Sequence, residues 1–148
     1  MKLIRKNKKE NDCGIVAAYN VASWCNIYKS YSEVERIAKS CGYNSERGIF
    51  FFQFAHLMKK LNIPIKKVNV SSIEDMKEKF YAGKLLAFLY TSVGFNVGHA
   101  MIGFLGHNAK IQMVNSLSSY NWIDFSEEIE ECGMKNFIVY EIPARIKK

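Results

Sequence analysis

The stretch Asn11-Asp12-Cys13-Gly14-Ile15-Val16-Ala17-Ala18-Tyr19 joins a lysine-rich arm to an apolar segment. Residues 13–27 are apolar nearly all round a helical wheel, which predicts a buried central helix. A helix start presents unpaired backbone N–H groups and the positive end of the helix dipole, so a thiol there ionises more readily than a free one. We therefore expect Cys13 to be a nucleophile and Asp12 to be the N-cap.

The alternative is that Cys13 is a small apolar residue of a core helix, because free cysteines are commonly buried and inert. Its position at the helix start, with a histidine and an asparagine downstream, favours the functional interpretation. Cys25, Cys41 and Cys132 form no Cys-x-x-Cys pair, which argues against a zinc site. We expect no metal, no cofactor and no disulfide, and we expect Cys25 and Cys41 to pack in or near helices.

Length and charge limit the other function classes. A chain of 148 residues predicts one domain spanning residues 1–148. No apolar run of about 18 residues is present, so no membrane span is expected. The first residues lack the apolar stretch of a signal peptide, which indicates a cytoplasmic protein. The chain has a net charge of +7, and many of its lysines and arginines lie near the two ends. We interpret these charged ends as solvated. A nucleic-acid partner is the alternative, but no helix-turn-helix, zinc finger or RNA-binding aromatic motif supports it.

The apolar periodicity changes from helical to alternating along the chain. Helices are expected first: residues 13–27, a second to about residue 40 that begins at the capping box Ser32-Glu33-Val34-Glu35, a third from Gly48 to about residue 61, a fourth to about residue 82 that is capped by residues 71–75, and a short one at residues 126–131. Strands are expected at residues 65–70, 85–91, 98–105, 110–115 and 137–142. This order predicts an α+β fold, with N-terminal helices packed on a C-terminal antiparallel sheet.

A cysteine nucleophile needs a base, and the chain offers three histidines. His56 lies in an apolar helix and is interpreted as a packed or surface residue. His107 lies in a hairpin turn, where a histidine is tolerated by the backbone, and it is not expected to be the base. His99 follows Gly98 at the mouth of a strand, where it can face a cleft. With a turn near residues 106–109, position 99 is expected to pair with position 115 or 116, so that Asn115 orients the imidazole.

These residues resemble the papain-like cysteine peptidases, and most closely the bacteriocin-processing group that cleaves leader peptides after double glycine. The shared features are Asp-Cys-Gly before an alanine-rich helix, a Gly-led third helix, a Gly-His strand and an orienting residue at Asn115. The resemblance extends from about residue 7 to residue 116. It implies a papain-like fold and a Cys13–His99–Asn115 site. It also implies that the Asn7 amide and the Cys13 backbone N–H stabilise the oxyanion of an acyl-enzyme reaction.

The sequence departs from this family's pattern at two site positions. Asn7 stands where the family has a glutamine, and Asn115 replaces the usual aspartate and precedes Ser116 instead of proline. The family domain is also often fused to a membrane transporter. The expected activity is hydrolysis of a peptide or isopeptide bond in a polypeptide substrate. Two alternatives stay open: a catalytically degenerate domain that binds a leader or partner peptide, and a deamidase, transglutaminase or other acyltransferase that uses the same residues.

Overall fold

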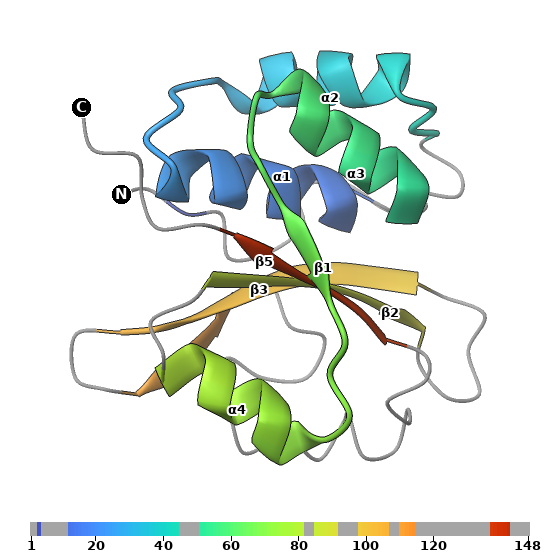
Figure 1. Ribbon diagram of the computed structural model, residues 1–148. Coiled ribbons are helices and arrows are strands. Elements are labelled where there is room, and N and C mark those ends of the chain that lie inside the picture. The colour runs from blue at the N-terminus through green and yellow to red at the C-terminus, as the bar shows by residue number, and fades with distance from the viewer. Residues whose placement is uncertain are drawn as a thin grey trace.

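Four helices and five strands are present in the part of the chain that the computed structural model describes, namely residue 3 and residues 12–44, 51–81, 85–91, 98–106, 110–114 and 137–142 (Figure 1). Their order along the chain is α1 (Cys13–Trp24), α2 (Tyr31–Ser40), α3 (Phe51–Lys60), β1 (Lys66–Val68), α4 (Ile73–Tyr81), β2 (Leu85–Thr91), β3 (Gly98–Leu105), β4 (Ile111–Val114) and β5 (Phe137–Ile142). The helix expected at residues 126–131 lies outside the described residues.

The five strands form one antiparallel sheet in the order β1-β5-β2-β3-β4. β2 lies at its centre, and Leu89 pairs with Ala100 of β3 on one side and with Ile138 of β5 on the other. β1 comes from the helical half of the sequence, yet it pairs with β5 at the sheet edge. The arrangement confirms the α+β class, with one early strand added to the later ones.

Helices cover both faces of the sheet (Figure 1). α1, α2 and α3 lie over one face, as expected, but α4 lies over the opposite face and not with the other N-terminal helices. β3 is therefore apolar on both sides: Ala100 and Ile102 belong to the larger core under α1, and Met101 belongs to the smaller core with Phe80 of α4. Both faces of β3 must be apolar because each is covered by a helix.

Two helix boundaries differ from those expected. α1 ends at Trp24 and not near residue 27, because Asn26 adopts a left-handed φ of 59° and the Ile27 N–H turns back to the Ala22 carbonyl at 2.8 Å. The capping box of α2 begins two residues earlier than predicted, at Ser30. The Ser30 hydroxyl accepts from the Glu33 N–H at 3.2 Å, and the Glu33 carboxylate accepts from the Ser30 N–H at 3.2 Å.

Candidate active site

Cys13 is the first residue of α1, as the sequence predicts. The helix that follows is almost entirely buried, and Ile15, Val16 and Ala18 have no exposed surface. The Cys13 side chain itself is half-buried. A buried apolar helix thus begins with a partly accessible thiol, which is a suitable geometry for a nucleophile.

The N-terminus of Cys13's helix lies beside the start of β3. α1 packs on β3, and the Ala100 backbone N–H faces the Cys13 sulfur. At the other end of the helix, the rings of Trp24 and Phe104 lie 5.2 Å apart between centroids. α1 and β3 therefore run side by side in the same chain direction. Cys13 lies beside the N-terminal end of β3, where Gly98 and His99 are the first two residues.

Cys13 and His99 are linked through Ala100. The Ala100 N–H faces the Cys13 sulfur, and His99 is the residue before Ala100 in β3. The backbone of His99 lies in β3 and pairs with Tyr90 of β2. Its side chain is outside the described residues, as are Asn7 and Asn115. The structure thus brings Cys13 to the strand position that follows His99, while the roles of the imidazole, Asn7 and Asn115 stay predictions.

The register of β3 with β4 differs from the one expected. Pairing of position 99 with 115 or 116 would set Ile102 opposite Gln112 or Met113, whereas the structure sets Ile102 opposite Val114. β3 ends at Leu105, as expected, but β4 begins at Ile111, so the turn between the paired residues Leu105 and Ile111 is longer than predicted. The described ladder ends at this Ile102–Val114 pair, before it reaches either predicted site residue.

Burial shifts the pKa of the Cys13 thiol in the direction opposite to the one expected for a helix start. Burial raises the pKa of the Cys13 thiol above its ordinary value, and the neighbouring Asp12 carboxylate raises it further. The backbone N–H groups of Ala100, Gly14 and Cys13 lower this pKa, as a helix start should, but they do not outweigh desolvation. The described surroundings therefore do not make Cys13 a readily ionised thiol by themselves.

Asp12 occupies the N-cap position but does not cap α1 with its side chain. Its carboxylate is fully buried and accepts a hydrogen bond of 2.6 Å from the Tyr31 hydroxyl. Burial raises the pKa of Tyr31, and so does this bond to Asp12. Tyr31 is a site neighbour that the sequence reasoning missed, because nothing in the spacing of residues 12 and 31 indicates that they meet.

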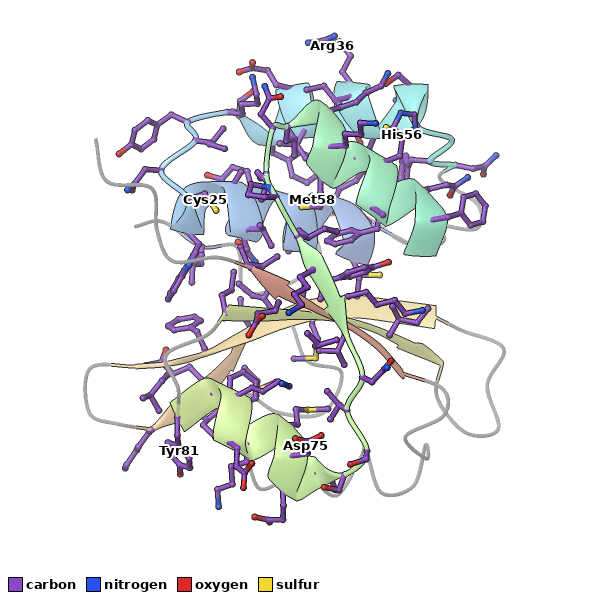
Figure 2. The ribbon with its side chains drawn as sticks, viewed as in Figure 1. Cys25, Arg36, His56, Met58, Asp75 and Tyr81 are labelled. Carbon is purple, nitrogen blue, oxygen red and sulfur yellow. The ribbon has the colours of Figure 1, made fainter. Side chains whose placement is uncertain are left out.

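Cys25, Cys41 and His56 occupy places that the sequence indicated, whereas Cys132 and His107 lie outside the described residues. Cys25 and Cys41 are buried at the ends of α1 and α2. His56 is exposed on α3, in the helical layer remote from α4 (Figure 2). Among the described residues, no group of three or more histidine, cysteine, aspartate or glutamate side chains is placed to hold a metal ion. None of the helices in the described ranges is long and apolar enough to cross a membrane.

Comparisons with known proteins find a structural likeness but no sequence match. No protein-family profile and no curated protein matches the sequence. The fold is similar to the crystal structure of the peptidase domain of Streptococcus ComA, a bi-functional ABC transporter involved in a quorum-sensing pathway. The TM-score is 0.62 at 13% sequence identity, and the match covers 93% of this chain and 96% of that one. The chain thus shares the overall fold of that domain.

Proposed function

We propose that this chain is a cysteine peptidase of papain-like type, with Cys13 as nucleophile and His99 as general base. The observation that carries the proposal is the meeting of the Cys13 thiol, at the start of buried α1, with the backbone of β3 next to His99. The likeness to a peptidase domain over nearly the whole chain supports it. The three described cysteines are free thiols, which suits work in a reducing compartment such as the cytoplasm.

The proposed reaction is acyl transfer through a thioester. His99 takes the Cys13 proton, and the thiolate attacks the carbonyl carbon of the scissile bond. The Cys13 backbone N–H and the Asn7 amide donate to the oxyanion. The C–N bond breaks as the imidazolium protonates the leaving amine. Water, deprotonated by His99, then attacks the thioester, releases the new carboxylate and restores the thiol. Asn115 orients the imidazole throughout.

The raised pKa of Cys13 favours a second candidate, a papain-like domain that binds a peptide without cleaving it. A nucleophilic cysteine needs a substantial thiolate fraction, and burial opposes thiolate formation here. In this alternative His99 supplies no imidazolium partner, and the chain holds a leader or partner peptide against the start of α1.

Labelling with a peptidyl epoxide, read by peptide-mapping mass spectrometry, distinguishes the two candidates. A peptidase labels selectively at Cys13, and the Cys13→Ala variant folds like the wild type but neither labels nor cleaves. Cys25→Ala and Cys41→Ala serve as controls and should cleave normally, since both residues lie at the far ends of their helices. Absence of labelling, or cleavage by Cys13→Ala, contradicts the proposal.

The products identify the acyl-transfer class. A peptidase yields two fragments that together contain one added water. A deamidase instead leaves the peptide intact with a glutamine converted to glutamate, and a transglutaminase joins it to an amine. Mass spectrometry of a peptide mixture incubated with the protein separates these outcomes.

A further inference from the structure

The residue before Cys13 is tied to the second helix by a buried hydrogen bond. Asp12 has 0% exposed surface, and its Oδ2 accepts from the Tyr31 hydroxyl at 2.6 Å. Tyr31 is the first residue of α2, so the bond joins the beginnings of two packed helices. Hydrogen bonds from a hydroxyl to a carboxylate belong to the short, strong class.

The same residue sets the start of α1. The Asp12 carbonyl accepts the Val16 N–H at 2.9 Å, which is the first hydrogen bond of the helix. The peptide bond from Asp12 to Cys13 also carries the Cys13 N–H, which faces the thiol sulfur. Fixing the Asp12 side chain therefore fixes the direction in which the Cys13 N–H and side chain leave the helix start.

The charged and titratable groups around this point come from several elements. α2 supplies Tyr31, and it also supplies Glu35, whose charge raises the pKa of Tyr31 and of Tyr43. Tyr43 follows α2 and is nearly buried. Burial raises the Tyr43 pKa most, followed by Asp12, Glu35 and Cys13. β3 contributes the Ala100 N–H beside Cys13 and the neighbouring position His99.

We propose that Tyr31 is a positioning residue for Cys13: its hydroxyl holds the buried Asp12 carboxylate and so fixes the peptide from which α1 and the nucleophile begin. The catalytic consequence of this inference rests on the proposed function. The hydrogen bond from Tyr31 to Asp12, which we call the tether, does not. Tyr31 acts through Asp12 and touches neither the scissile bond nor the thiol. It joins the first turn of α2 to the orientation of a residue 18 positions earlier.

Tyr31→Phe removes the hydroxyl and keeps the ring, and Tyr28→Phe is the matched control because Tyr28 is 82% exposed in the preceding loop. We expect Tyr31→Phe to lower kcat about tenfold, equivalent to about 1.4 kcal/mol of transition-state stabilisation. KM should stay within about twofold, because the tether acts on orientation and not on substrate binding. Tyr28→Phe should match the wild type in both.

A second readout needs no substrate. The rate of Cys13 alkylation by iodoacetamide at high pH, where the thiol is fully ionised, reports how the sulfur is held. Loosening the tether should expose the half-buried sulfur and raise this plateau rate about threefold or more. Circular dichroism and an unfolding curve select conditions in which each variant is fully folded.

The conservative variant separates position from charge. Asp12→Asn keeps an oxygen acceptor for Tyr31, so it should retain most of kcat, whereas Asp12→Ala should lose as much as Tyr31→Phe. Asp12→Asn should also move the midpoint of Cys13 alkylation to lower pH, because the carboxylate that raises the Cys13 pKa is gone. Equal losses in the Asn and Ala variants would overturn the tether.

The two readouts keep the inference separate from the proposed function. If the wild type cleaves nothing, the peptidase proposal fails, and the alkylation plateau alone decides the tether. If the wild type cleaves and Tyr31→Phe equals it in kcat and plateau rate, the tether is wrong while the peptidase stands. A Tyr31→Phe protein that is merely less stable, with both reactivities unchanged, shows a structural role only and also overturns the inference.

Discussion

At the scale of single residues, the reactivity of Cys13 depends on whether His99 supplies a cation. The described surroundings raise the Cys13 pKa by burial, so a thiol without a partner should ionise only above its ordinary range. If the His99 imidazolium pairs with the thiolate, wild-type alkylation should show a limb at lower pH that belongs to the pair. His99→Ala should lose this limb and keep a single rise above the ordinary thiol range. The measurement is Cys13 alkylation rate against pH.

His107→Ala is the matched control for that experiment, since it removes an imidazole that the sequence assigns to a hairpin turn. Its profile should coincide with that of the wild type. Coincidence of the His99→Ala profile with the wild type would instead mean that no cation supports the thiolate. That result would favour the peptide-binding alternative.

Asn7 decides how the oxyanion is held. Its amide is the predicted second donor beside the Cys13 N–H, and loss of one oxyanion donor typically lowers kcat by roughly 100- to 1,000-fold. Asn7→Ala should show a loss of this order with little change in KM, because the donor acts in the transition state. Asn7→Gln tests whether the site is shaped around the shorter side chain, in which case it should also lose activity. Equal kcat for wild type and Asn7→Ala would assign the oxyanion to other donors.

At the scale of helices and strands, patterns of apolar residues predicted more than local polar signals did. The bounds of β2, β3 and β5 agree with the apolar runs at residues 85–91, 98–105 and 137–142, and these are the three inner strands of the sheet. The polar signals were less certain because one residue type serves several purposes. Ser30 and Ser32 both precede an acidic residue at capping distance, and only the structure selects Ser30.

Asp12 shows the same limit at the site. Local sequence predicts that a carboxylate before a helix caps it, but a hydroxyl brought by α2 provides a competing donor. Packing also buries Cys13 enough to reverse the expected direction of its pKa shift. Both outcomes depend on contacts between residues distant in sequence, which periodicity and spacing do not contain.

The turn after α2 is a place where sequence and structure agree and where a substitution has a defined cost. Gly42 adopts a φ of 103°, and an added Cβ would collide with the Gln53 side chain, whose Nε2 donates to the Gly42 carbonyl at 3.2 Å. Gly42→Ala should therefore lower the free energy of unfolding by about 1–2 kcal/mol, the cost of placing a side chain in left-handed backbone. Urea unfolding measures this change.

Gln53→Ala separates the backbone strain from the collision. It removes the hydrogen bond to Gly42 and should cost about 0.5–1.5 kcal/mol alone. Because it also empties the space that the new Cβ needs, the double variant should cost less than the two single variants together. A fully additive double variant would assign the whole cost of Gly42→Ala to φ. Cys13 alkylation should stay unchanged in all three.

At the scale of the whole molecule, β3 couples the proposed site to both layers of helices. Ala100 meets α1 and the thiol, while its neighbour Met101 packs in the α4 core. The backbone between them cannot shift toward one layer without opening the other. A sheet covered on both faces therefore holds the start of β3 firmly beside the start of α1, which is what a preorganised nucleophile and base require.

This shared sheet predicts that the chain unfolds as one cooperative domain. Met76 is fully buried on α4, and Met76→Ala should lower the free energy of unfolding by about 2–5 kcal/mol through the cavity it leaves. Trp24 reports on the opposite layer, where it packs against Phe104, and a Trp122→Phe background makes it the sole tryptophan. Urea curves from Trp24 fluorescence and far-ultraviolet circular dichroism should coincide and shift together in Met76→Ala. A Trp24 transition that stays in place while the circular dichroism splits into two steps would show that the two layers unfold separately.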